Sequence, residues 1–395
     1  MKKGNKVGHA VFSLVGALLL MGICYVFDNN PYPYGESTKS LTFIESLIQQ
    51  RNRKSPNFDD VLFLNTEYDL EFVSSWKGKE VITNRGRLVQ VLSDIQQAEY
   101  RHVFLDIRLE NNYKTASDSA LCKEIRGMGD ALTFAKQWDV KNNRDVPLID
   151  SNLVSQAAYC DFTYSGVNSS FQRYQFIQHY GLSAPLKIYQ RYDGHTINPH
   201  NIWFWKNAYY TDNGRLCLNS LFITIPEDFS DTRYRMSGIP KYYNLTQDFY
   251  GDNAGLTPRD FQIMCDGKLL VIGNFKEDVH DTYLNKQPGP YLNYLAFDSL
   301  RSGKHIIPFW YLVVVLLVFS ITLFQITEQT KFIEYLPFVA KSKFLRFLLT
   351  LVGYTALLSV LSIITYSIFG RVVAVFIPTL YFSIVDLFYR YKRYD

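Results

Sequence analysis

Long runs of apolar residues occur near both ends of the chain, and short apolar runs alternate with polar segments between them. A helix needs about 20 apolar residues to cross a bilayer. The first long run also lacks a small-residue cleavage site after it, so it is expected to stay as an uncleaved anchor. The pattern predicts an α-helical membrane bundle of four spans. These lie near residues 7–27, 307–325, 345–368 and 372–388.

The basic residues of the short segments give the expected orientation, because Lys and Arg beside spans are retained on the cytoplasmic side. We therefore expect a multi-pass protein of the bacterial inner membrane with both termini cytoplasmic and a large extracytoplasmic domain. The basic residues are Lys2, Lys3, Lys6, Lys331, Lys341, Lys343, Arg346, Arg390, Lys392 and Arg393. The predicted divisions are 1–28 with the first span, 29–306 outside the membrane, and 307–395 with the other spans.

Short apolar runs in the middle of the chain predict buried strands, and two segments between them have helical spacing. Alternating strands and helices indicate an α/β domain with a largely parallel sheet flanked by helices. The strand runs are Val61–Leu64, Val103–Leu109, Val146–Ile149, Leu221–Ile225 and Leu269–Ile272, and the helical ones are Gly86–Gln97 and Asp118–Trp138.

The alternation fades from about residue 151 to 260, where aromatic residues accumulate. This aromatic-rich insertion has two interpretations. Its Tyr and Trp side chains form an irregular core or an extra sheet, or they form a surface that binds a glycan or a partner protein.

The formal net charge of +4 divides unevenly along the chain. Residues 28–306 carry 30 basic and 33 acidic residues, so the basic surplus lies in and beside the membrane segments. We expect these basic groups to serve topology and to contact membrane lipids. A basic patch of the kind that binds nucleic acid is not indicated.

Motifs of catalysis and cofactor binding are missing from the sequence. It contains no serine-nucleophile elbow, no HExxH helix and no phosphate-cradling glycine-rich loop with Lys. We therefore predict a protein that is not an enzyme and has no catalytic residues, cofactor or metal site.

Four cysteines lie in the predicted extracytoplasmic domain. Either they form disulfides or they remain buried thiols, and the sequence leaves both alternatives open. They are Cys122, Cys160, Cys217 and Cys265.

Acidic side chains gather directly after three predicted strands. Loops at the carboxyl ends of parallel strands form the crevice in which α/β sheets bind ligands. These residues either bind a cation or cationic solute, or they hydrogen-bond the loops and cap the helix that begins near Pro290. The candidate ligand-binding residues here are Glu67, Asp106, Glu110, Asp278, His280 and Asp281.

Two stretches of the chain carry a family pattern. The first is VLFLNTEYD with the following ITNRGRLVQVLSDIQQAEYRHVFLDIRLE, and the second is VIGNFKEDVHDTYLNKQPGPYLNYLAFDSL. Both resemble the CHASE2 family of extracytoplasmic sensory domains. That family has one span before the domain and three after it. Asp106 is similar to the family's strand-end Asp. The later positions that match in order are Gly273, Asp278, His280, Thr282, Pro288, Gly289, Ala296 and Asp298.

The resemblance implies a sensory subunit that receives an extracytoplasmic ligand. Asn293 and Leu295 stand where the family usually has His and Asn, so Asn293 joins the ligand-binding candidates with a changed preference. Only seven residues follow the last span, which predicts that no output domain is present and that the signal passes to a separate protein partner. The alternative is a non-enzymatic scaffold or assembly subunit of a bacterial envelope complex.

Overall fold

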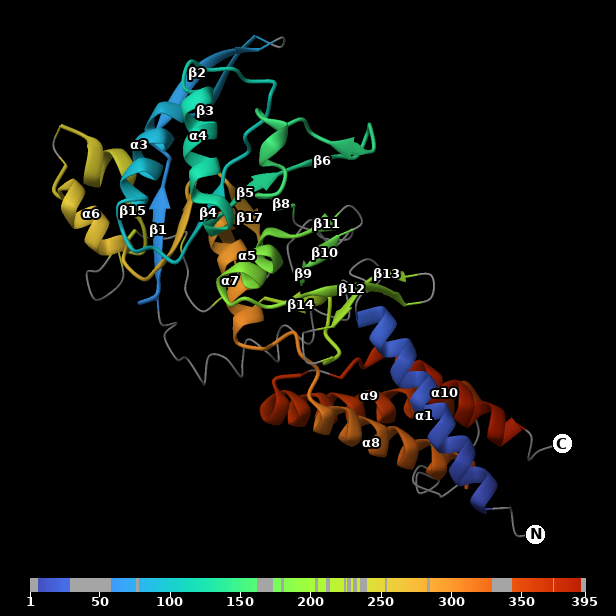
Figure 1. Cartoon of the computed structure of the whole chain (residues 1–395). Coiled ribbons are helices and arrows are strands. Elements are labelled where there is room, and N and C mark those ends of the chain that lie inside the picture. The colour runs from blue at the N-terminus through green and yellow to red at the C-terminus, as the bar shows by residue number, and fades with distance from the viewer. Residues whose placement is uncertain are drawn as a thin grey trace. The chain divides into compact units, whose positions relative to one another are not determined.

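The computed structural model describes most of the chain and contains two compact units (Figure 1). We call Met1–Gln49, Arg215–Leu218 and Ile306–Asp395 the membrane unit, and Gln50–Gly214 with Asn219–His305 the sheet unit. The described residues are 6–28, 58–75, 78–161, 173–178, 181–202, 205–210, 214–223, 225, 229, 233–234, 240–252, 254–282, 285–328, 343–371 and 373–391.

Within these residues the sheet unit is built on parallel strands in the order β15-β1-β16-β4-β5-β8. The predicted α/β fold with a largely parallel sheet is confirmed. The strands are β15 (Tyr243–Asn244), β1 (Val61–Asn65), β16 (Leu269–Gly273), β4 (His102–Asp106), β5 (Leu132–Lys136) and β8 (Ala157–Tyr159).

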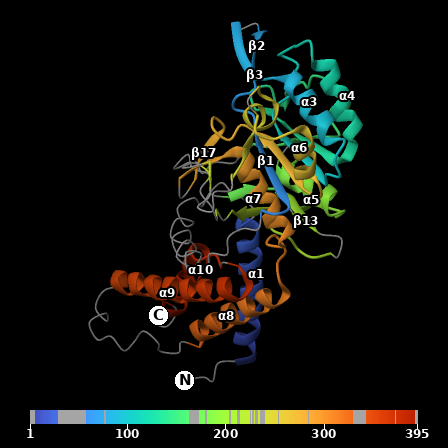
Figure 2. The same cartoon turned by 90° about the vertical axis from the view of Figure 1, so that its left-hand side faces the viewer.

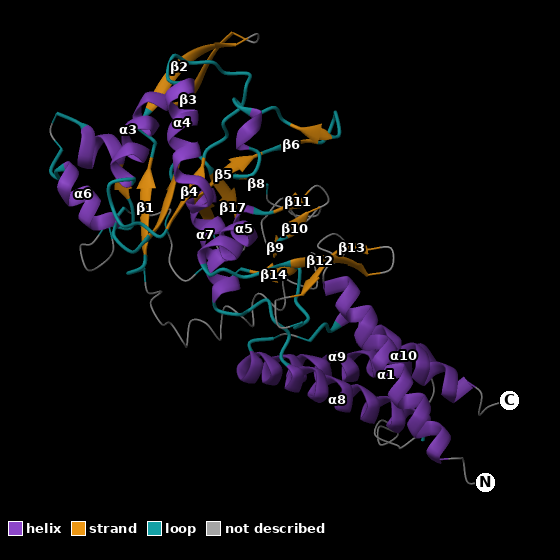
Figure 3. Ribbon diagram, in the orientation of Figure 1, coloured by secondary structure: helices purple, strands orange, loops and turns teal. Residues whose placement is uncertain are grey.

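The direction of each connection decides which face of the sheet its helix covers, because crossovers between parallel strands are right-handed. The connections from β1 to β4, from β4 to β5 and from β15 to β16 all step the same way along the sheet. They carry α3 (Arg85–Ile95), α4 (Asp118–Met128) and α6 (Pro258–Cys265), which therefore share one face. The return from β8 carries α5 (Ala184–Tyr192) to the other face, where α7 (Gly289–Arg301) contacts it (Figure 3).

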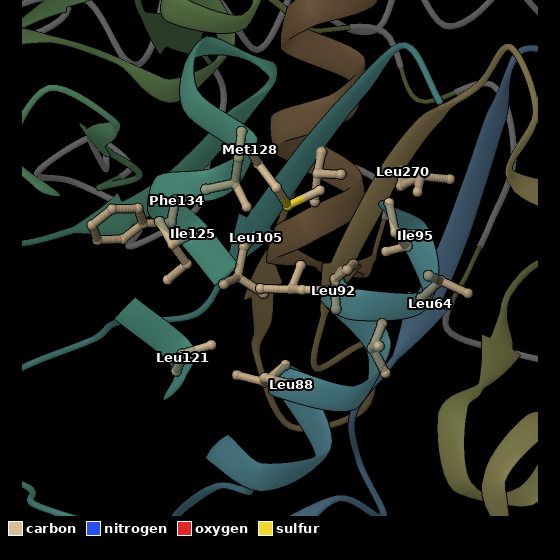
Figure 4. Packing of buried hydrophobic residues seen from close by; sticks show 14 of the residues in the cluster. Leu64, Leu88, Leu92, Ile95, Leu105, Leu121, Ile125, Met128, Phe134 and Leu270 are labelled. Atoms are coloured by element: carbon tan, nitrogen blue, oxygen red, sulfur yellow. The ribbon is translucent and has the colours of Figure 1, made fainter. Parts of the chain in front are cut away.

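Leucine and isoleucine fill the layer between the sheet and α3, α4 and α6 (Figure 4). Paired residues Leu64, Ile272 and Leu105 lie side by side on neighbouring strands and point to this face. The period of two along each strand sends the next residues to the opposite face. Strict in-register pairing thus builds two different cores on the two sides of one sheet.

The opposite face carries an aromatic core around Phe63 of β1. Its ring centroid lies 5.3 Å from that of Phe229 and 5.1 Å from that of Tyr294 on α7, both in edge-on contacts. Phe58, Phe275 and Tyr291 complete the ring of contacts. These edge-on geometries are the favoured ones for aromatic pairs.

Three predicted elements differ in the structure. The helical segment predicted to run to Trp138 ends at Met128, because Gly129 takes a positive φ of 53° that terminates the helix, and β5 follows. Val146–Ile149 is a loop around Pro147 with one isolated bridge between Glu110 and Leu148. The run at Leu221–Ile225 contributes only β14 (Ser220–Phe222), which pairs antiparallel with β9 (Arg173–Gln175) outside the main sheet.

The aromatic-rich insertion contributes mainly core where its burial is described. Tyr174, Phe176 and Tyr189 are buried, which agrees with the core interpretation for these residues. The remaining short strands of the sheet unit pair antiparallel in twos. They are β2 (Leu70–Ser75), β3 (Gly78–Thr83), β6 (Trp138–Asp139), β7 (Arg144–Asp145), β10 (Ile177–Gln178), β11 (Gly181–Leu182), β12 (Asn198–Ile202), β13 (Trp205–Tyr210), β17 (Val279–Asp281) and β18 (Lys286–Pro288).

The β2–β3 hairpin projects past the carboxyl end of β1 in both views (Figure 2). Phe72 and Val81 pair directly across it, so both side chains lie on the same face. Phe72 is 80% exposed and Val81 51% exposed. Large apolar side chains grouped on a projecting element commonly mark interaction surfaces.

The membrane unit consists of α1 (Lys6–Asp28), α8 (Phe309–Thr327), α9 (Lys343–Phe369) and α10 (Phe376–Tyr391) among the described residues. Apolar side chains of these helices form its core. A Cβ atom on Gly16 would lie 3.1 Å from Leu323 of α8, so this glycine permits the close approach of α1 and α8.

Three of these helices are long and apolar enough to cross a membrane by length and composition, within the described part of the chain. They support the prediction of a multi-pass membrane protein. The fourth predicted span corresponds to α10, whose apolar part, Phe376–Tyr389, is shorter than the other three. At 1.5 Å per residue, the 16 residues of α10 cover about 24 Å, less than the usual thickness of the hydrocarbon core.

One end of the membrane unit is tied by polar contacts to the short segment Arg215–Leu218. The Tyr25 hydroxyl donates to the Cys217 carbonyl at 2.9 Å, and the Ile307 amide donates to the Leu216 carbonyl at 3.0 Å. Arg371, which follows α9, donates to the Ile306 carbonyl at 2.7 Å. The start of the α8 segment is therefore held by α1 and by the α9–α10 turn.

Candidate functional site

The pairing register brings Asn65, Gly273 and Asp106 into one row at the carboxyl ends of β1, β16 and β4. They follow Phe63, Val271 and Phe104 by two residues, so their side chains belong to the face covered by α7. The chain leaves β1 and β4 toward α3 and α4 but leaves β16 toward α7 on the opposite face. Neighbouring strands whose connections diverge in this way form the crevice where α/β sheets bind ligands.

Gly273 lets the first turn of α7 enter this row. A Cβ atom on Gly273 would lie 2.5 Å from Cγ of Pro290 and 3.2 Å from Cβ of Asp106. Pro290 therefore occupies the space that a side chain in the middle of the row would need. The beginning of α7 therefore occupies the middle of the crevice, above Gly273.

Asp106 is connected to α7 and to the insertion by a short chain of hydrogen bonds. Nδ2 of Asn293 donates to Oδ2 of Asp106 at 2.9 Å. The Tyr174 hydroxyl of β9 donates to Oδ1 of the same Asn293 at 2.7 Å. Asn293 and Tyr174 are each only 1% exposed, so this part of the hydrogen-bonded chain lies inside the protein. The amide uses one donor and one acceptor to join three elements.

Burial raises the pKa of Asp106 to about 7, and repulsion by the Asp278 carboxylate adds to that rise. Hydrogen bonds from Asn293 and Cys160 and the charge of Arg108 oppose the shift without cancelling it. Near neutral pH this carboxyl is therefore divided between its neutral and ionised forms. Burial and the Asp106 charge also raise the pKa of the Cys160 thiol, which makes it unreactive at neutral pH.

Asp278 and His280 form the second part of the site, beside the first residue of α7. His280 Nε2 lies 3.0 Å from Oδ1 of Asp278. The Gly289 amide donates to the Asp278 backbone carbonyl at 2.7 Å. A Cβ on Gly289 would collide with the Asp278 carboxylate and lie 3.1 Å from His280 Nε2. Capping of this helix by Asp278 and His280 was one of the two interpretations of the sequence. In the structure Pro288 holds the cap position, and no side-chain hydrogen bond caps the helix there.

Asn65 organises the part of the edge nearest β1. Its Oδ1 accepts from the Phe275 amide at 2.9 Å, and its Nδ2 donates to Asn244 at 2.7 Å and to Glu67 at 3.3 Å. Glu67 is therefore linked to the crevice through Asn65. These bonds fix the loop that leaves β16 toward Asp278.

Glu110 and Asp281 lie apart from the hydrogen-bonded chain. Glu110 belongs to the α4 side of the sheet, where its backbone carbonyl accepts from the buried Arg85 at 3.2 Å. Asp281 is exposed on β17 opposite Lys286. The structure thus brings Asp106, Asp278, His280 and Asn293 together. Glu67 is linked to the crevice only through Asn65, and Glu110 and Asp281 lie away from the group.

The candidate residues form neither a metal-binding group nor a disulfide among the described residues. Within the described ranges, no group of three His, Cys, Asp or Glu side chains is arranged to hold a metal ion. No disulfide joins any of the five cysteines, all of which lie in the described ranges, and this includes Cys122, Cys160, Cys217 and Cys265. The Cys160 thiol instead donates to the Ala158 carbonyl at 3.9 Å.

Two members of the site were not found from the sequence. Tyr174 lies in a segment without clear periodicity, and nothing local marks it as a partner of Asn293. Cys160 was considered only for disulfide pairing.

Comparison with protein-family models, curated proteins and solved structures finds no match for this chain. The geometry of the carboxyl edge therefore carries the functional argument.

Gly273→Ala tests the contact between the sheet edge and α7. We expect a loss of about 1–3 kcal/mol in the free energy of unfolding, typical of an overpacked core, and faster amide hydrogen exchange in the first turns of α7. Denaturant unfolding and exchange of the full-length protein in detergent measure both. Gly255→Ala is the matched control, because its added Cβ would have no atom within 4 Å. Equal effects of the two changes would contradict the contact.

Proposed function

We propose that this protein is a CHASE2-like integral membrane sensory subunit. In this proposal it crosses the bacterial inner membrane four times, with α10 as the fourth span, and its termini are cytoplasmic. The extracytoplasmic sheet unit receives a small ligand or a change in conditions at the carboxyl edge. A separate protein partner receives the signal from the membrane helices. The protein itself is proposed to carry out no reaction.

The observation that carries this proposal is the path of α7. Its second turn binds Asp106 through Asn293, and its last residue, Arg301, precedes α8 by only seven residues. A helix can transmit displacement of one end to the other because its backbone hydrogen bonds keep it stiff. A change at Asp106 or Asp278 therefore has a short covalent route to a candidate span.

The surfaces of the candidate spans support the membrane part of the proposal. Leu19 of α1, Ile321 of α8 and Val352 of α9 are each more than half exposed in the structure. Apolar side chains of this size are stable at such positions when lipid covers them. The basic residues beside the spans support cytoplasmic termini.

A second candidate function is a non-enzymatic scaffold or assembly subunit of a bacterial envelope complex. The β2–β3 hairpin favours it, because Phe72, Val81 and Leu70 are exposed together on one projecting face. The crevice, whose middle Pro290 occupies, also suits a protein whose sheet unit serves as a platform.

One crosslinking experiment separates the two functions. A photoreactive amino acid replaces Ile321 of α8 in one full-length variant and Phe72 of β2 in another, and both are irradiated in native membranes. The sensory proposal expects a protein adduct from position 321 whose yield changes at least about threefold when Gly273→Ala is added. A shift of that size corresponds to under 1 kcal/mol of coupling between the two sites.

The other outcomes are equally informative. An adduct from position 72 alone, unchanged by Gly273→Ala, favours the scaffold and counts against the relay. Adducts with lipid only at position 321, and none with protein at position 72, contradict both functions. Position 140, where Val140 is 81% exposed in the loop between β6 and β7, serves as the surface control.

A further inference from the structure

The Asp106 carboxyl lies between an amide that holds α7 and a carboxylate that adjoins the first residue of α7. Asn293 Nδ2 donates to it at 2.9 Å. Asp278 faces it from the loop after β16 and lies against Gly289. The charge of the Asp278 carboxylate acts on Asp106 and makes ionisation of the more buried Asp106 carboxyl costly. The closed arrangement of α7 therefore favours the protonated form of Asp106.

The charged and titratable groups around Asp106 do not remove this conflict. Arg108 is the cation nearest in effect, but its side chain is about half exposed and is shared with Asp161 at 3.7 Å. His280 contacts Asp278, so a protonated imidazole would relieve repulsion and a neutral one would not. Cys160 and Asp161, which directly follow β8, and Tyr174 of β9 carry a thiol, a carboxyl and a phenol, and none of these groups can supply positive charge.

We propose that Asp106 is a proton-operated latch on α7. In its neutral form it holds Asn293 and tolerates Asp278 at the helix start. When the proton leaves to solvent water, the two carboxylates repel each other, and the first turns of α7 separate from the carboxyl edge of β4. The proton is then the signal received at the proposed sensory site. The latch itself does not depend on the proposed sensory function, and only its effect on the membrane helices rests on that function.

The direction of the pH dependence follows from linkage between protonation and opening. In the closed state the pKa of Asp106 is raised to about 7, and in an opened, hydrated state it takes the ordinary value of about 4. The closed state then binds more protons between these values. Opening becomes up to about tenfold more favourable for each pH unit gained in that window and levels off above about pH 7.

Hydrogen exchange of the full-length protein in lipid nanodiscs tests the latch. Peptides covering the first turns of α7 are followed from about pH 5 to about pH 9, and each rate is divided by the rate in Asp106→Asn at the same pH. This ratio removes the intrinsic pH dependence of exchange. We expect it to rise at least about tenfold and to reach a plateau near neutral pH. Asp281→Asn, an exposed carboxyl on β17, should leave the profile unchanged.

A ratio that is flat with pH would overturn the latch. Should Asp106→Asn fail to fold, infrared titration of the wild type supplies the second measurement: a carboxylic acid band lost with a midpoint near 7 is expected, moved to lower pH in Asp278→Asn. Absence of that band, or no movement in Asp278→Asn, also overturns it. His280→Gln tests whether the titration belongs to the imidazole. We expect the carboxyl midpoint of Asp106 to persist in this variant. Neither measurement needs a partner protein. If Asp106 titrates as expected but no partner is crosslinked, the result refutes only the proposed transfer of the signal to a partner and leaves the latch standing.

Discussion

Phe63→Ala is expected to lower the free energy of unfolding of the sheet unit by about 3–5 kcal/mol, as for other buried Phe to Ala changes. Phe63 is 2% exposed, and its ring contacts five other aromatic rings. These belong to Phe58, Phe229, Phe275 and, on α7, Tyr291 and Tyr294. Its removal leaves a cavity that rigid rings cannot refill, since each is held by other neighbours. Denaturant unfolding of the full-length protein in detergent, followed by tyrosine fluorescence, measures the loss.

Phe72→Ala is the matched control for this prediction. It removes the same atoms from β2, where the side chain is 80% exposed, so unfolding should change by about 0.5 kcal/mol or less. Similar losses for the two variants would mean that the aromatic layer under α7 contributes little. A loss confined to Phe63→Ala would also predict faster exchange in α7, because Tyr291 and Tyr294 pack on this ring.

Arg85→Met has the second large expected effect, a loss of about 3 kcal/mol in unfolding free energy. Arg85 is 2% exposed and donates to Oδ1 of Asp118 at 2.5 Å and to the Glu110 carbonyl. Removing one partner of a buried ion pair leaves the other charge uncompensated. Asp118 is 21% exposed and keeps its Thr115 hydrogen bonds, which places the loss at the lower end of the usual range.

The pH dependence of this loss has a defined sign. Burial alone would raise the pKa of Asp118, but hydrogen bonds from Arg85 and Thr115 outweigh it and hold that pKa below its ordinary value. A lowered carboxyl pKa stabilises the fold above the unfolded value and ceases to do so as pH falls through the folded one. The difference between wild type and Arg85→Met should therefore shrink below about pH 4.

Arg126→Met is the control for Arg85→Met, because Arg126 also pairs with an aspartate, Asp150, but is 51% exposed. Exposed pairs contribute about 0–1 kcal/mol. A loss in Arg126→Met as large as in Arg85→Met would show that the effect comes from charge alone and not from burial of the pair.

Much of the sheet could be predicted because its strands are short, fully apolar runs. Val61–Leu64 and Leu269–Ile272 match β1 and β16 to within one residue, since strands buried on both faces need no polar position. The helix at Gly86–Gln97 was also predicted, and Asn84 caps it by accepting from the Arg87 amide. β5 was missed because its residues continued the apolar spacing of α4, and only Gly129 marks the break.

The candidate site was predicted in part for a comparable reason. Asp106 and Asp278 follow apolar runs, so their place at the carboxyl edge follows from local pattern. Asn293 came from the family resemblance, and in the structure its amide bonds Asp106 and Tyr174. Tyr174 is 119 residues from Asn293 in the chain, and no local spacing encodes such a pair.

The sequence by itself determined the long apolar helices, the parallel α/β layer and the acidic residues after its strands, because these depend on hydrophobic periodicity within a few residues. Tertiary structure alone decided that Gly273 leaves room for Pro290, and that Asp106 shares its surroundings with Asp278. Both depend on register between strands far apart in the chain. Burial then changed the chemistry of Asp106, since a carboxyl's proton affinity is set by neighbours that only the folded chain provides.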